Sequence, residues 1–161
     1  MDIFAHSIGL ANRFTCVSGP GAGSTHLNAF DAALIASGVG NYNLLRVSSI
    51  LPPQAVRSDV INVPFGAPLL IAYGFHEAHE KNDHVAASIS IGVPKDRSLP
   101  GVIMEHSHHG SLADSLKIVR GMAEEGMGMR KFAIDEIIAF GSEARSDGGN
   151  VCAFAGCALW R

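Results

Sequence analysis

Short runs of apolar residues, many of them alternating with polar ones and bounded by Gly or Pro, recur along the chain and predict β-strands. The alternation is clearest in His84–Gly92, where every second residue is Val, Ala or Ile. We predict strands at Asn43–Ile50, Ala67–Tyr73, Val85–Val93, Val102–Glu105, Ile134–Phe140 and Val151–Trp160.

Two other segments carry apolar residues at helical spacing. Ser24 and Thr25 can cap a first helix that ends near Gly38, and its apolar face is Leu27, Phe30 and Leu34. Ser111 begins a second helix, with Asp114 at capping-box spacing. Its stripe and its expected end are Leu112, Leu116, Val119, Ala123 and then Gly126 or Gly128. Because the helices lie between groups of strands, we predict an α+β layered domain.

The segment Gly19–Thr25 is rich in glycine and precedes the first predicted helix. It lacks the lysine of a nucleotide-binding loop, and its third glycine is misplaced for a dinucleotide-binding loop. We therefore interpret it as a tight turn into a capped helix, without a bound phosphate.

Composition limits the possible classes of protein. The 161 residues, 16.9 kDa, fit a single domain, and 47% hydrophobic with 17% charged residues exclude a disordered chain. A net charge of −3 offers no basic field for nucleic acid or for an anionic membrane. The longest apolar stretches are about half as long as a membrane span requires. The apolar composition instead favours a homo-oligomer.

The cysteines and the N-terminus bear on localisation. Cys16, Cys152 and Cys157 form no CxxC motif and indicate reduced thiols of a cytoplasmic protein. Asp2 and His6 stand where a secretory signal would have a basic segment followed by an apolar run, so no such signal is expected.

Eight histidines are many for this length, and six of them fall in two clusters. Histidine spacing alone often suggests metal sites that do not exist, and a solvated loop explains both clusters equally well, so we predict no native metal site. The clusters are His76, His79 and His84, and His106, His108 and His109.

The segment Asn41–Pro53 combines a predicted strand, the pair Ser48–Ser49, two apolar residues and two prolines. One interpretation is a strand that ends at a proline. The other is backbone self-cleavage, in which the Ser49 hydroxyl attacks the Ser48 carbonyl of a strained turn. Elimination and hydrolysis would then leave a pyruvoyl group at position 49, an electrophile that no ordinary side chain supplies.

Three separated stretches resemble the pyruvoyl-dependent arginine decarboxylases, and together they span nearly the whole chain in the expected order. A fourth, shorter match is Glu105 in a Met-Glu-His-Ser context. The three stretches are Leu27–Leu34, Gly40–Leu44 running into Val47–Pro53, and Cys152–Ala155 with Ala158–Trp160.

The resemblance implies a four-layer αββα sandwich of the pyruvoyl-dependent histidine/arginine decarboxylase type. It also implies a single domain that cuts itself into a β chain, residues 1–48, and an α chain, residues 49–161, with the covalent pyruvoyl group derived from Ser49. Such protomers form homotrimers, paired into hexamers in some members, and the active sites lie between neighbours. The implied reaction converts L-arginine to agmatine and CO2.

The resemblance also assigns roles to residues. Glu105 is implied as the catalytic acid, Asn43 as an aid to processing, and Asp31 as the carboxylate that holds the substrate guanidinium. The matching positions around the pocket are Leu34, Gly40, Tyr42 and Ser48.

The chemistry agrees with these roles. Loss of CO2 leaves a carbanion at Cα, and a Schiff base to the pyruvoyl ketone withdraws its electrons. A carboxylic acid such as Glu105 can then protonate Cα. Asp31 borders the apolar face of the first predicted helix and can bind a guanidinium bidentately.

Other functions stay open at this stage. The same chemistry could act on histidine, lysine, ornithine or aspartate, or the chain could be an unprocessed trimeric protein that binds an amine. We also hypothesise that His106, next to Glu105, makes the activity pH-dependent near neutrality.

Overall fold

The computed structural model describes residues 9–161, so Asp2 and His6 lie outside the described residues. The described part forms two helices and nine strands. In chain order these are β1 Arg13–Gly23, α2 His26–Ala36, β2 Asn43–Arg46, β3 Ile50–Leu51, β4 Val56–Arg57, β5 Pro68–Ala78, β6 His84–Pro94, β7 Gly101–His109, α3 Leu112–Met129, β8 Ile134–Arg145 and β9 Asn150–Trp160.

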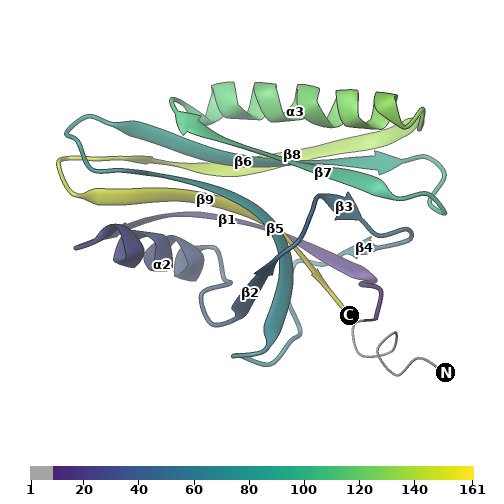
Figure 1. The fold of residues 1–161 in the computed structure, drawn as a ribbon, viewed down its shortest axis with the longest axis horizontal. Helices are drawn as coiled ribbons and strands as arrows, with labels where there is room; N and C mark the ends of the chain where they lie inside the picture. The colour runs from purple at the N-terminus through teal and green to yellow at the C-terminus, as the bar shows by residue number, and fades with distance from the viewer. Residues whose placement is uncertain (1–8) are drawn as a thin grey trace.

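The strands form two sheets that stack on each other, as Figure 1 shows. One has five strands in the order β2-β5-β9-β1-β4, and the other has four in the order β3-β7-β6-β8. α2 covers the outer face of the five-stranded sheet and α3 that of the four-stranded sheet (Figure 1). β6 and β9 are buried over nearly their whole length because both faces of each strand are covered. The prediction of a mixed α+β fold is confirmed.

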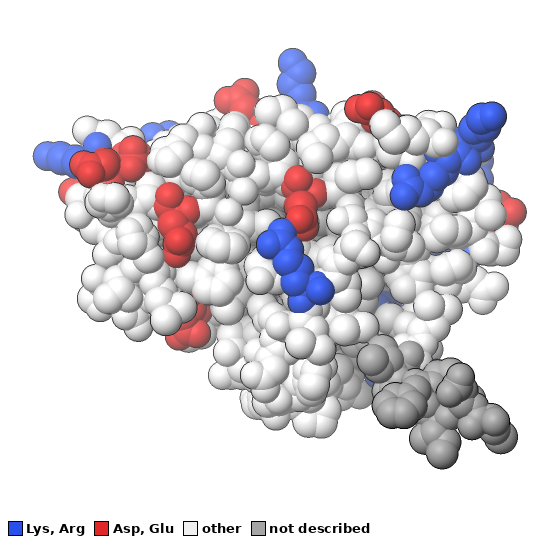
Figure 2. Space-filling model, viewed as in Figure 1, with Lys and Arg blue, Asp and Glu red and all other residues white. Residues whose placement is uncertain are grey.

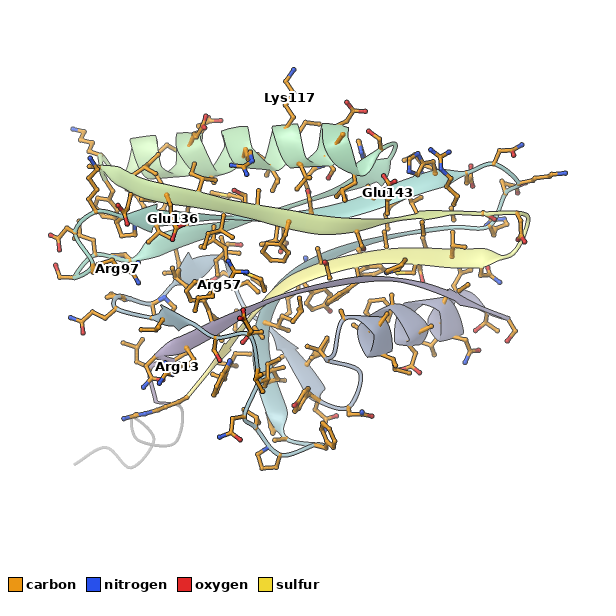
Figure 3. The ribbon with its side chains drawn as sticks, turned by 180° about the vertical axis from the view of Figure 1, so that it is seen from behind. Arg13, Arg57, Arg97, Lys117, Glu136 and Glu143 are labelled. Carbon is orange, nitrogen blue, oxygen red and sulfur yellow. The ribbon has the colours of Figure 1, made fainter. Side chains whose placement is uncertain are left out.

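Both helices begin where their caps predict. The Thr25 hydroxyl accepts from the backbone N–H of Asn28, and Ser111 does the same for Asp114. The Glu143 carboxylate, beside the start of α3 in Figure 3, accepts from the N–H of Leu112 at 2.7 Å. This bond is the main reason why the pKa of Glu143 lies below its usual value.

One detail of the predicted helices is wrong. Leu27 is 74% exposed, and α2 instead buries Ala29 and Ala33. Of the two predicted ends of α3, Gly128 lies within one residue of the observed end at Met129, and Gly126 lies inside the helix. Gly126 packs on Met104 of β7, whose Cε would lie 2.5 Å from a Cβ at position 126. No helix among residues 9–161 is long and apolar enough to cross a membrane.

The predicted turn at Gly19–Thr25 is also wrong, because Gly19–Gly23 belongs to β1 and pairs with β9 along its whole length. Gly21 faces α2, and a Cβ there would collide with the backbone of Ala29 and Ala33. Gly19 and Gly23 approach the helix similarly. Glycines in this strand therefore allow a close contact between helix and sheet, and they do not mark a turn.

Three strand predictions need correction. Asn43–Ile50 is divided into β2 and β3 by the segment 47–49. β7 runs on from Glu105 to His109, so the second histidine cluster lies in a strand. His76 lies in β5, where a polar loop was expected.

Candidate active site

The segment 46–50 carries the chain from one sheet to the other. Val47 N–H still donates to Ile71 of β5, and two residues later Ile103 N–H of β7 donates to the Ser49 carbonyl at 2.8 Å. The register Ile50↔Val102 continues this pairing. The Ser48–Ser49 peptide thus lies at the crossover, held at both ends by backbone hydrogen bonds.

The Ser48 carbonyl oxygen accepts from the N–H of Ile50 at 2.9 Å. This bond spans three residues and closes a tight turn centred on Ser49. A donor placed on a carbonyl oxygen stabilises negative charge that develops there, so the turn favours nucleophilic attack on the Ser48 carbonyl carbon.

Glu105 lies in the middle of β7, on the face that looks toward the five-stranded sheet. Its neighbours across the gap are Gly74 of β5, where a Cβ would lie 3.6 Å from the Glu105 Cβ, and Arg46 at the end of β2. Glu105 Oε1 accepts from Arg46 Nη2 at 2.6 Å, whereas Oε2 is buried and has no partner among residues 9–161. A carboxyl oxygen without a partner is available for a proton or a ligand.

Glu105 opens into a cleft of about 370 Å³, which is within the size range of small-molecule sites. The cleft is lined by Arg46, Gly74, Phe75, Glu105, His106 and Ser107. Ile103 faces the same side of β7 as Glu105, because side chains two apart share a strand face. Its N–H holds the Ser49 carbonyl, so the structure brings Ser48, Ser49 and Glu105 to one edge of the sandwich.

Arg46 was not among the residues singled out from the sequence. Besides Glu105 it donates to the Tyr73 carbonyl at 2.7 Å, and its guanidinium lies 4.7 Å from the centroid of the Tyr73 ring. The available signal was a cation ending an otherwise apolar strand two residues before Ser48.

The remaining predicted residues lie around α2 and the α2–β2 connection, away from Glu105. Asp31 is exposed, Leu34 is half-buried, and Gly40 packs closely against Ile35. The Tyr42 ring lies 5.6 Å from that of Phe65, and Asn43 Nδ2 donates to the Gly66 carbonyl at 2.6 Å. Asn43 begins β2 and Ser48 follows its end, a separation of up to about 16 Å along an extended chain.

The histidines divide between the two faces of β7. His106 points toward α3, where Nδ1 lies 2.9 Å from the Ser115 hydroxyl, so it faces away from Glu105. His109 points the other way and lies 2.9 Å from His76 of β5. Burial is the main cause that lowers the pKa of both His76 and His106. Within residues 9–161, no three His, Cys, Asp or Glu side chains are placed to hold one metal ion.

Figure 2 shows one face of the molecule, where acidic and basic side chains are few and scattered, without a continuous field of one sign. The fold and the site define a mixed α+β protein with two adjacent serines at the crossover between its sheets and a cleft that is lined by the ion pair of Arg46 and Glu105.

The chain matches the family model described as pyruvoyl-dependent arginine decarboxylase over residues 13–154. It is 45% identical to a pyruvoyl-dependent arginine decarboxylase of Methanococcus maripaludis over 150 residues, which cover 92% of this chain and 90% of the relative. A Methanocaldococcus jannaschii protein of the same name is 41% identical, with 94% and 91% covered. One from Pyrococcus abyssi is 32% identical, with 75% and 77% covered. The chain belongs to the pyruvoyl-dependent arginine decarboxylase family.

Proposed function

We propose that this chain is a self-processing, pyruvoyl-dependent carboxy-lyase that converts L-arginine to agmatine and CO2. The observation that carries the proposal is membership of this family together with a Ser48–Ser49 peptide that is hydrogen-bonded to β7 at Ile103, two residues before Glu105.

Self-cleavage begins when the Ser49 hydroxyl oxygen bonds to the Ser48 carbonyl carbon and the C–N bond breaks, which turns the amide into an ester. Removal of the Ser49 Cα proton then expels the Ser48 carboxylate and leaves a dehydroalanyl residue. Water replaces its nitrogen, which leaves as ammonia, and a ketone remains at position 49. The Ile50 N–H stabilises the charge on the Ser48 oxygen during the first step. The products are residues 1–48 and residues 49–161.

The surroundings of position 49 fit such a ketone. The Ile103 N–H fixes the backbone of residue 49, and Gly74 leaves the space above Glu105 open. When present, the ketone supplies an electrophile for the substrate amine and an electron sink for the carbanion. Glu105 delivers the proton to Cα, and its unpartnered Oε2 is the oxygen available for this transfer.

Substrate selection is assigned to the α2 side. Asp31 receives the guanidinium of arginine bidentately, and Leu34, Gly40 and Tyr42 shape the pocket around it. Asn43 assists processing. Because these residues lie apart from Glu105 in one protomer, each active site combines the α2 side of one copy with the crossover of another.

The assembly is a homotrimer of cut protomers, with paired trimers as the hexameric form, each protomer a four-layer αββα sandwich of the pyruvoyl-dependent histidine/arginine decarboxylase type. Support comes from large apolar side chains left exposed on α2, on β2 and in the segment after β4, which a second copy would cover. They are Leu27, Ile35, Leu45, Val60 and Phe65. Three cysteines outside any disulfide suit a reducing cytoplasm.

The test is a denaturing gel with intact-mass analysis of the purified protein. We expect fragments of residues 1–48 and 49–161, the larger with a blocked N-terminus, and three times 16.9 kDa or six times that mass in native light scattering. CO2 release is then assayed with arginine, histidine, lysine, ornithine and aspartate. A single full-length chain that binds amines without turnover would overturn the proposal.

Ser49→Ala is the matched variant. Without the hydroxyl there is no nucleophile for the ester step, so the chain stays whole and CO2 release is lost completely. Ser58→Ala, a change of another half-buried serine outside the crossover, serves as the control and is expected to cut itself normally.

A further inference from the structure

Arg46 is held at three points in the uncut chain. Its Nη2 donates to Glu105 Oε1 and to the Tyr73 carbonyl, and its guanidinium lies over the Tyr73 ring. Among residues 9–161 no other acceptor is hydrogen-bonded to the guanidinium, so its remaining N–H donors are free. Arg46 also lines the cleft. A half-exposed arginine with spare donors can hold a second anion.

Self-cleavage produces such an anion close by. Before the cut, the guanidinium of Arg46 balances the carboxylate of Glu105. The cut adds the carboxylate of Ser48, which begins at most about 7 Å along the backbone from Arg46. One cation then stands beside two carboxylates.

We propose, on the basis of the proposed function, that Arg46 is a positioning residue that transfers its guanidinium from Glu105 to the new C-terminal carboxylate of Ser48 when the chain is cut. Arg46 thereby anchors the end of the fragment 1–48 in the active site and releases Glu105 from its ion pair.

The backbone supports this transfer. Val47 N–H is tied to Ile71 of β5, so only Ser48 extends beyond the last strand bond of the fragment. The Ser48 oxygen already accepts from Ile50 N–H and gains a full negative charge on cleavage. Guanidinium and carboxylate form the strongest, bidentate type of hydrogen-bonded pair, whereas the present contact to Glu105 uses a single nitrogen.

The transfer also suits the task of Glu105. Oε2 already has no partner among residues 9–161, and departure of Arg46 frees Oε1 as well. Both carboxyl oxygens of Glu105 are then open to the substrate.

The experiment compares wild type, Arg46→Gln, Arg46→Lys and Arg57→Gln after self-cleavage. Arg57 is an exposed arginine on β4, labelled in Figure 3, with only a 3.9 Å contact to Asp59, and is the matched control. Each protein is treated with carboxypeptidase, and loss of Ser48 from the fragment 1–48 is followed by mass spectrometry. We expect Arg46→Gln to be trimmed at least about tenfold faster than wild type, the factor that corresponds to one charge-assisted hydrogen bond.

Arg46→Lys is expected to recover much of the protection, since it keeps the charge, and Arg57→Gln to be trimmed at the wild-type rate. Equal trimming of wild type and Arg46→Gln overturns the inference, and so does failure of lysine to protect better than glutamine. These outcomes are distinct from failure of the proposed function, in which the wild type itself stays uncut.

A second measurement does not depend on folding of an Arg46 variant. Crystal structures of Ser49→Ala and of the cut wild type are expected to place Arg46 on Glu105 in the first and on the Ser48 carboxylate in the second. An unchanged Arg46–Glu105 pair in the cut protein overturns the inference.

Discussion

The proposed site has two sides that are built differently: a crossover side with Ser48, Ser49 and Glu105, and an α2 side with Asp31 and Asn43. Ser48, Ser49 and Glu105 are fixed by backbone hydrogen bonds between strands of both sheets and by an ion pair. Asp31 and Asn43 lie on exposed surface; Asn43 begins the edge strand β2, where its backbone N–H donates to Ala67 and its side chain donates to Gly66. In the proposed active site, one chain therefore builds the side that breaks bonds, and the exposed side that we propose selects the substrate is completed by a second copy.

Glu105→Gln tests the crossover side most strongly. The amide keeps the shape of the side chain but cannot deliver a proton, so kcat is expected to fall about 10²–10⁴-fold, the usual contribution of an acid catalyst. Self-cleavage, followed on a denaturing gel, is expected to survive, because the nucleophile and the Ile50 donor are unchanged. A kcat close to wild type would remove Glu105 from the chemistry.

Asp31→Asn tests the α2 side. Loss of the charged partner of a guanidinium is expected to raise KM for arginine about 10–100-fold, while the fragments 1–48 and 49–161 still form. Asp135→Asn, at an exposed position of β8, is the control. If KM for arginine stayed the same, Asp31 would not bind the substrate.

Gly21→Ala separates the two sides of the proposed site further, because it shifts α2 and leaves the side chains of Asp31, Ser49 and Glu105 unchanged. A Cβ at position 21 meets the backbone of Ala29 and Ala33, so we expect a loss of about 1–3 kcal/mol in the free energy of unfolding. Denaturant unfolding measures this loss. KM is expected to rise while self-cleavage continues; slowed self-cleavage with normal KM would contradict the division into two sides.

The smallest expected effect concerns the pair His76–His109, which joins the two sheets at the edge beyond Glu105. Burial, with the charges of His109 and His108, lowers the pKa of His76, while Asp83 lies 3.8 Å from His109. The unfolded chain therefore binds more protons than the folded one between the lowered pKa of His76 and its usual value. Stability is thus complete above the usual pKa and is lost as the pH falls through it.

His76→Gln is expected to flatten the decline of Tm between about pH 7.5 and pH 5.5, a window around the ordinary histidine pKa. His79→Gln, whose side chain is 58% exposed in the native protein, is the control and should decline as wild type does. Equal slopes for wild type and His76→Gln would assign the acid sensitivity elsewhere.

The helix starts could be predicted from the sequence because a cap is a local feature, formed at Thr25 and Ser111 with residues three positions ahead. The choice between Gly126 and Gly128 as the end of α3 could not be made from the sequence, because it depends on how the last turn of α3 packs on Met104 of β7. The glycines of β1 were wrongly predicted to form a turn, because their role is to let α2 pack closely on the sheet, and that contact is not visible in the local sequence.

The candidate cleavage site, Ser48–Ser49 with the family motifs around it, could be predicted from the sequence, because two adjacent hydroxyl residues are a local feature. Tertiary structure alone decided that Arg46 pairs with Glu105, that His106 faces α3, and that α2, which carries Asp31, covers the outer face of the five-stranded sheet, away from β7 (Figure 1). These relations depend on strand register and on which face of β7 a side chain occupies. Register is set by pairing between residues far apart in the chain, which local sequence does not specify.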